Sequence, residues 1–177
     1  VSARGSVVTV DADSGRVLWS RRIPGTPELL AFSANGSRLL VLTRSVALVL
    51  SSAGVPVRSV TAPAGAPFID GGLSPSGTTL ALLTPRTVTL VDAAGLRALP
   101  APVFTVPHGG LRQLSWSPDG RWLLASWPPA DQWIFIHASG SPRLEIVSHV
   151  AEQFSSAGGS SFPHIDGWCC TVRGGAT

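Results

Sequence analysis

The sequence contains no lysine and no methionine, and only two cysteines among its 177 residues. Without a lysine ammonium, the chain can use neither Schiff-base chemistry nor a phosphate-binding loop of the lysine type. Because the first residue is Val1, we expect a chain that was processed or cut from something longer. The cysteines, Cys169 and Cys170, are neighbours, and a bridge between them would strain the backbone. We expect two small apolar residues of a buried strand, with a redox or intermolecular role as the alternative.

Charge is also scarce: 13% of the residues are charged, whereas 44% are hydrophobic. With 19 glycines and 15 prolines, the chain is too apolar for disorder and too rich in turns for a helix bundle. No stretch approaches the roughly 18 consecutive apolar residues of a membrane helix, so we expect no membrane span. All 13 positive residues are arginines, and they are scattered except for the pair Arg21-Arg22. A nucleic-acid surface normally clusters its positive charge, so we expect no nucleic-acid partner.

A turn signature recurs along the chain with glycines 41 and 43 residues apart. Its three copies are Ser33-Ala34-Asn35-Gly36, Ser74-Pro75-Ser76-Gly77 and Ser117-Pro118-Asp119-Gly120. Each copy stands between two short apolar runs, which is the pattern of a β-hairpin. A period in the forties is the length of one four-stranded propeller blade.

A second turn signature runs in step with the first and indicates a second hairpin in each unit. Its copies end at Gly15, Gly54, Gly95 and Gly140, with spacings of 39, 41 and 45 residues. Four antiparallel strands per unit predict an all-β fold, a β-propeller of about four blades. We place a half blade at 1–26, full blades at 27–65, 66–106 and 107–150, and a linker with a closing strand at 151–177.

The closing strand is expected in the apolar segment 162–172, and we expect it to dock against the N-terminal half-blade, because propellers close their ring this way. Four blades is the lower end of the usual range, so two arrangements remain open. The chain forms a small closed ring, or it is an arc of a larger one. An arc would expose apolar blade faces, through which two copies could form a homodimer.

The Ser-Pro-Asp-Gly turn between apolar strands at this period resembles the TolB-like and WD40-like β-propeller repeats of bacteria, over about residues 1–150. The stretch from Val10 to Trp19 is similar to a quinoprotein-type repeat. The sequence departs from WD40 blades in having no Trp-Asp dipeptide, and it has one tryptophan in the quinoprotein position. The resemblance implies a domain of a bacterial protein outside the cytoplasm, with a cytoplasmic location as the alternative.

Candidate catalytic and metal-binding residues are few. Asp11 and Asp13 imitate the start of a calcium loop, but the remaining ligands are absent, so we interpret them as turn residues. The four histidines stand at no metal-ligand spacing, and His108-Gly109-Gly110 lacks the Gly-x-Ser-x-Gly partner of an esterase. We therefore assign no catalytic, cofactor or metal residues.

Tryptophans concentrate in the unit 107–150, interleaved with arginines, which is typical of a stacking surface. We expect Trp116 and Trp122 to pack between blades. Trp127 and Trp133 bracket a loop, and with Arg112 and His108 they form a candidate binding rim, although a purely structural role for the tryptophans is the alternative.

Acids are scarce and stand mostly in turns, so the sequence favours a non-enzymatic interaction module that binds a protein or peptide partner. The resemblance to TolB-like and WD40-like repeats implies the same function. The alternative is a ligand-binding or catalytic propeller of the quinoprotein or glycan-handling type. A deep pocket lined by the four rim residues would favour this alternative, whereas a flat loop face would favour the interaction module.

Overall fold

A computed structural model describes residues 2–3, 5–94, 102–138, 143–154 and 161–168. These residues form four antiparallel sheets, which we call A to D in chain order. Sheet A contains β1 (Ser2–Ala3), β2 (Ser6–Val10) and β3 (Val17–Arg22). Sheet B contains β4 (Leu29–Phe32), β5 (Arg38–Leu42), β6 (Val46–Ser51) and β7 (Pro56–Thr61).

Sheets C and D repeat the four-stranded plan of sheet B. Sheet C contains β8 (Asp70–Leu73), β9 (Thr79–Leu83), β10 (Thr87–Asp92) and β11 (Phe104–Thr105). Sheet D contains β12 (Leu114–Trp116), β13 (Trp122–Trp127), β14 (Gln132–His137) and β15 (Leu144–Ser148). A 3₁₀ turn, η1 (Pro128–Ala130), joins β13 to β14, and the short helix α1 (Val150–Phe154) follows β15. The expected all-β architecture is confirmed.

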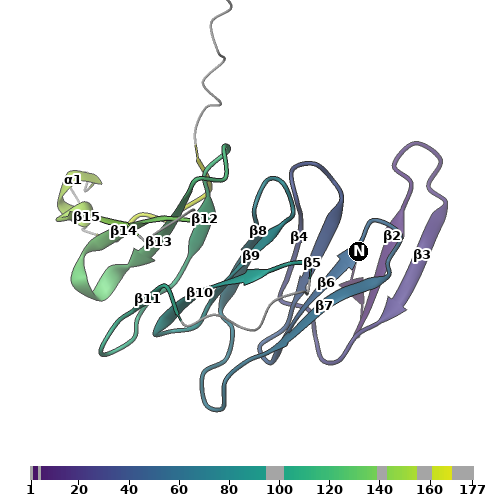
Figure 1. Ribbon diagram of the computed structural model, residues 1–177, viewed down its shortest axis with the longest axis horizontal. Coiled ribbons are helices and arrows are strands. Elements are labelled where there is room, and N and C mark those ends of the chain that lie inside the picture. The colour runs from purple at the N-terminus through teal and green to yellow at the C-terminus, as the bar shows by residue number, and fades with distance from the viewer. Residues whose placement is uncertain (1, 4, 95–101, 139–142, 155–160, 169–177) are drawn as a thin grey trace, which may run out of the picture.

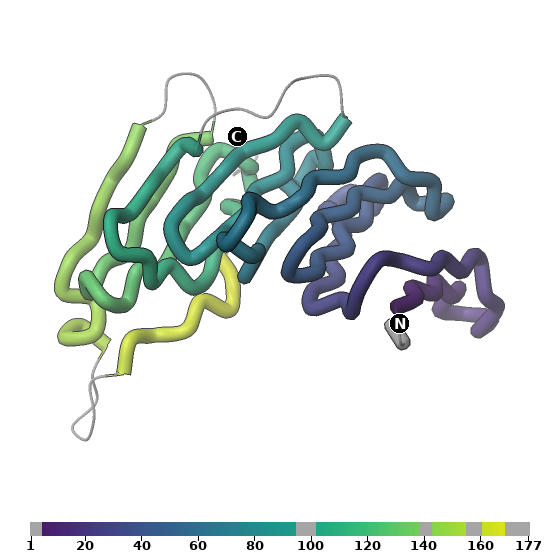
Figure 2. The backbone as a smooth tube through the Cα atoms, turned by 90° about the horizontal axis from the view of Figure 1, so that it is seen from below, coloured from purple at the N-terminus to yellow at the C-terminus, as the bar shows by residue number. Residues whose placement is uncertain are grey.

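The sheets stand side by side as an open fan, with sheet A at one end and sheet D at the other (Figures 1 and 2). The first strands of sheets B, C and D, which we call the inner strands, are neighbours, because β8 contacts both β4 and β12. The described sheets do not close into a ring.

The second strands of sheets B, C and D, which are β5, β9 and β13, consist largely of apolar residues because these strands are covered on both faces. In β9, Leu80 and Leu82 belong to the core shared with sheet B, whereas Ala81 and Leu83 belong to the core shared with sheet D. A third core joins sheets A and B around Val7, Leu39, Val41 and Leu50. Outer strands are more exposed, and β15 is exposed at every position except its last residue.

The recurring turns form the hairpins that the sequence predicts. In each turn the glycine N–H donates to the carbonyl of the serine three residues earlier, at 2.8 to 2.9 Å, and the glycine has a positive φ near 70°. Neighbouring turns also touch, since Asn35 Nδ2 donates to Ser76 O at 2.8 Å. Turn chemistry therefore fixes each hairpin and helps to hold adjacent sheets in register.

The C-terminal segment lies elsewhere than expected. Residues 161–168 carry no assigned strand, and their described contacts are with sheet D rather than with the N-terminal hairpin. The physical reason is the open fan: sheet A lies at the far end, while the outward face of sheet D offers the rings of Trp133 and Phe135. Cys169 and Cys170 lie outside the described residues.

Trp19 joins sheet A to sheet B in a close contact. Its indole Nε1 donates to Ser52 O at 2.9 Å, and its ring lies over Gly54 so tightly that a Cβ there would stand 2.6 Å from the ring. Gly54 also has a φ of 75°, which L-residues with a side chain rarely adopt.

We expect Gly54→Ala to destabilise the protein more than Gly15→Ala does. Gly15 has a similar φ of 68°, but nothing lies within 4 Å of its Cβ position, so the control measures backbone strain alone. The clash with Trp19 should add about 1–3 kcal/mol to the loss of unfolding free energy. Urea unfolding followed by tryptophan fluorescence measures both variants. Equal losses would show that the Trp19 ring moves aside without cost.

Candidate functional site

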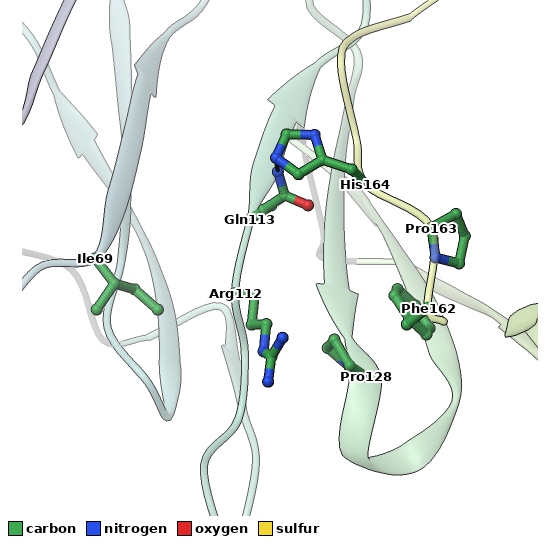
Figure 3. Close-up of a pocket in the computed structure, with 7 residues that line it drawn as sticks. All are labelled: Ile69, Arg112, Gln113, Pro128, Phe162, Pro163 and His164. Atoms are coloured by element: carbon green, nitrogen blue, oxygen red, sulfur yellow. Dashed lines mark hydrogen bonds between the residues drawn. The ribbon is translucent and has the colours of Figure 1, made fainter. Parts of the chain in front are cut away.

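A pocket of about 470 Å³ opens where the inner strands begin (Figure 3). Ile69 stands directly before β8, Arg112 and Gln113 stand directly before β12, and residues 162–164 run alongside. The C-terminal segment contributes Phe162, Pro163 and His164 to the lining, and Pro128 of η1 completes it. Three segments far apart in the sequence therefore meet because equivalent ends of neighbouring sheets lie together.

Gln113 is the polar centre of this pocket. Its Oε1 accepts the Ile165 N–H at 3.1 Å, which sets the orientation of the side-chain amide. The Nε2 group therefore faces His164 Nε2 at 2.6 Å and donates to it. The neutral His164 ring then carries its proton on Nδ1, which lies 3.1 Å from Asp166 Oδ1. Gln113 thus anchors the C-terminal segment and fixes the tautomer of the neutral histidine.

Asp70 lies behind the pocket, at the start of β8. Its Oδ2 accepts the Leu114 N–H and its Oδ1 accepts the Gly71 N–H, both at 2.8 Å. Burial raises the pKa of Asp70 above its ordinary value of 3.8, although these two hydrogen bonds and nearby His164 act in the opposite direction. Asp70 therefore joins the inner strands of sheets C and D.

Arg112 supplies the positive charge of the pocket. Its side chain projects from the segment before β12 into the space beside Pro128 (Figure 3). It is exposed, and none of the hydrogen bonds or ion pairs found within the described residues involves its guanidinium. The lining around it is largely apolar, with Ile69 and Phe162 among its members. This arrangement can accept a carboxylate together with an apolar neighbour.

The four expected rim residues do not gather around one cavity, and only Arg112 lines the pocket. Trp127 packs into the core between sheets C and D and donates from Nε1 to Gly109 O at 2.9 Å. Trp133 pairs with Ser126, the neighbour of Trp127 in β13, so the two indoles point to opposite faces of sheet D. His108 is exposed in the loop before β12. The proposed binding role of these residues stays a prediction.

Trp133 packs in an aromatic group on the outward face of sheet D. Its ring centroid lies 5.2 Å from that of Phe154 and 6.5 Å from that of Phe162. Trp122 lies on the same face, where its ring meets His137 edge to face at 4.8 Å. Trp116 packs between sheets, as expected, and donates from Nε1 to Gly72 O at 2.9 Å.

Gln113, Phe162 and His164 line the pocket but were not among the expected site residues, although one feature of the sequence draws attention to their segment. The tripeptide Ile-Asp-Gly occurs at 69–71, where β8 begins, and again at 165–167. The structure places 161–168 beside Arg112 and Gln113, at the ends of the inner strands.

The calcium-like stretch is a turn. Asp11 Oδ1 accepts both the backbone N–H and the hydroxyl of Ser14, at 2.8 and 2.6 Å. The pKa of Asp11 is lowered, mainly because its carboxylate accepts this hydrogen bond from the Ser14 hydroxyl. Within the described ranges there is no cluster of three side chains that could hold a metal ion, and no helix long and apolar enough to cross a membrane.

Together, the repeated four-stranded sheets and the pocket at the ends of their inner strands define a β-propeller fold. Solved structures with this likeness include hydrazine synthase of Kuenenia stuttgartiensis, with a TM-score of 0.58 and 22% identity over 81% of this chain and 44% of that one. The dihydro-heme d1 dehydrogenase NirN has a TM-score of 0.64 and 20% identity over 81% of this chain and 32% of that one.

A protein of unknown function from Bacteroides caccae is also similar, with a TM-score of 0.53 and 16% identity over 83% of this chain and 55% of that one. The chain thus spans less than two thirds of each of these structures. No family model and no curated protein matches it. At these identities the likeness shows the fold alone.

Asp70→Asn should remove a pH dependence of stability. Because burial raises the folded-state pKa, the protonated carboxyl stabilises the fold below its ordinary pKa of 3.8, and this contribution is lost as pH rises through the folded-state pKa. The unfolding free energy of the parent chain should therefore fall, relative to Asp70→Asn, as pH rises from 3.8. Urea unfolding on both sides of this pH measures the difference.

Asp119→Asn is the matched control, with the opposite sign. The hydrogen bond from the Ser117 hydroxyl is the main reason why the pKa of exposed Asp119 lies below its ordinary value of 3.8. The stabilisation by this carboxylate is therefore present above pH 3.8 and is lost as pH falls through the folded-state pKa. If both variants gave the same slope against pH, the burial argument for Asp70 would be wrong.

Proposed function

We propose that this propeller is a non-enzymatic interaction module that binds a protein or peptide partner at the pocket beside Arg112. The observation that carries the proposal is an exposed guanidinium, without a partner among the described residues, in a largely apolar pocket. An acidic side chain with an apolar neighbour fits this lining, since guanidinium groups bind carboxylates in a forked geometry. The partner we propose is therefore an acidic peptide segment.

The pocket is better suited to binding than to covalent catalysis. Its described lining contains no serine, cysteine or carboxylate that could act as a nucleophile. His164, its one general-base candidate, already lies against Gln113 and Asp166. A catalytic or glycan-handling propeller remains the alternative, and the His164–Asp166 pair is the observation that favours it.

Selection of phage-displayed random peptides on the intact chain tests the proposal. We expect the selected peptides to be enriched in Asp or Glu next to an apolar residue. Arg112→Gln should weaken their binding about tenfold or more, because a charge-assisted hydrogen bond contributes about 1.5–3 kcal/mol. Fluorescence polarisation with a labelled selected peptide measures the dissociation constant.

Arg16→Gln is the control for loss of one positive charge. Arg16 is exposed in the turn between β2 and β3, far from the pocket, so this variant should bind the peptide unchanged. Equal weakening by both variants would indicate general electrostatic attraction. Selected peptides without acidic residues would contradict the proposed partner.

A further inference from the structure

Gln113 makes two hydrogen bonds that only one orientation of its side-chain amide allows. Its Oε1 accepts the Ile165 N–H at 3.1 Å, and its Nε2 donates to His164 Nε2 at 2.6 Å. Nε2 also lies 3.5 Å from Ile165 O, so the amide contacts both backbone polar groups of Ile165. An amide carries its acceptor on one branch and its donors on the other, so each of the two short bonds fixes the other.

This arrangement needs a neutral His164 ring. The ring nitrogen Nε2 accepts a hydrogen bond only while it carries no proton, because both ring nitrogens of a protonated histidine are donors. Protonation would therefore place two donors face to face at 2.6 Å. The other ring nitrogen, Nδ1, can donate to Asp166 Oδ1 in either charge state. Only the contact with Gln113 thus depends on the charge of the ring.

Charged groups on three segments act on the His164 ring. Asp166 Oδ1 lies 3.1 Å from Nδ1, and the charge of Asp70, at the start of β8, interacts with the ring. Both carboxylates offer negative charge to a protonated ring, whereas Arg112, in the lining of the same pocket, repels it. His164 is exposed, so water can deliver the proton. Histidine is the side chain whose charge ordinarily changes between about pH 5 and about pH 8.

We propose that Gln113 and His164 form a proton-controlled switch in the wall of the pocket. When His164 gains a proton, the Gln113 amide turns over, so that its Oε1 accepts from His164 Nε2 and no longer from the Ile165 N–H. The exchange is favourable because a hydrogen bond from a charged donor is stronger than one between neutral groups. Gln113 thus holds Ile165 while His164 is neutral, and it holds His164 when the ring is protonated.

The change is confined to the middle of the segment 161–168. Trp168 Nε1 donates to Ser115 O at 3.0 Å, and Phe162 packs against Trp133 with ring centroids 6.5 Å apart. Neither contact involves a titrating group, so both parts of the segment stay on sheet D. Between them, the wall of the pocket loses one backbone anchor, while protonated His164 adds a positive charge to the lining.

Amide hydrogen exchange, followed by NMR on the labelled intact chain, tests the switch. No ligand is needed, so the result does not depend on the proposed acidic partner. The His164 ring signals report the charge state, and the Ile165 amide reports its bond to Gln113. From about pH 8 to about pH 5, the protection of the Ile165 amide, relative to an unstructured peptide at the same pH, should fall about fivefold, as expected for one hydrogen bond.

The Trp168 Nε1 proton is an internal control for the rest of the segment. Its bond to Ser115 involves no titrating group, so its protection should be the same at both pH values. Loss of this protection in step with that of Ile165 would show that the whole segment detaches, and it would overturn the local switch.

Gln113→Glu is the matched variant, because it keeps the shape of the side chain but has two acceptors and no donor. Its carboxylate can accept from the Ile165 N–H and from protonated His164 together. Protection of the Ile165 amide should therefore be at least as high at the lower pH as at the higher pH. A fall like that of the parent chain would overturn the proposal.

His164→Gln separates the switch from titration of Asp70 and Asp166. A glutamine at this position keeps an acceptor for Gln113 but does not titrate, so the Ile165 amide should keep its protection at both pH values. A fall in this variant would show that a carboxylate carries the response. That result, or constant protection in the parent chain, would contradict the proposal.

Discussion

Contact between successive inner strands is the constraint on which this fold depends. No sheet is self-sufficient, because β9 sends alternate side chains into two different cores, with Leu80 and Leu82 on one side and Ala81 and Leu83 on the other. Each sheet is therefore stable only where a neighbour covers it. Asp70 and Trp116 hold that neighbour in one register through hydrogen bonds to Leu114 and Gly72, so apolar packing and polar positioning act at the same junction.

The same constraint builds the pocket. Gln113, which is the counterpart of Asp70 in the next sheet, holds Ile165 and His164 instead of a full blade. Among the described residues, the segment 161–168 occupies this position, and side chains around it remain accessible, Arg112 among them. The recognition chemistry that we propose thus lies beside the ends of the inner strands, where Gln113 holds the segment 161–168.

The hairpins could be predicted from the sequence because their determinants are local. Gly36, Gly77 and Gly120 supply the positive φ that each turn needs, and the apolar runs beside them mark the strands. The site could not be predicted in the same way. Residues 161–168 have no such turn, and their position depends on tertiary contacts. Trp127 and Trp133 stand six residues apart and resemble one rim, but the pleat of sheet D turns them to opposite faces.

The concentration of aromatic residues in sheet D has a packing explanation in the repeat itself. By strand register, Trp133 opposite Ser126 corresponds to Val88 opposite Leu83 in sheet C and to Ala47 opposite Leu42 in sheet B. Val88 and Ala47 are fully buried because a whole sheet covers them, and small side chains suffice there. Trp133 faces a single segment and a short helix, which fill less volume, so a larger ring occupies the space. Even so, Trp133 stays only half-buried, and the outward face of sheet D keeps apolar surface that a further sheet can cover.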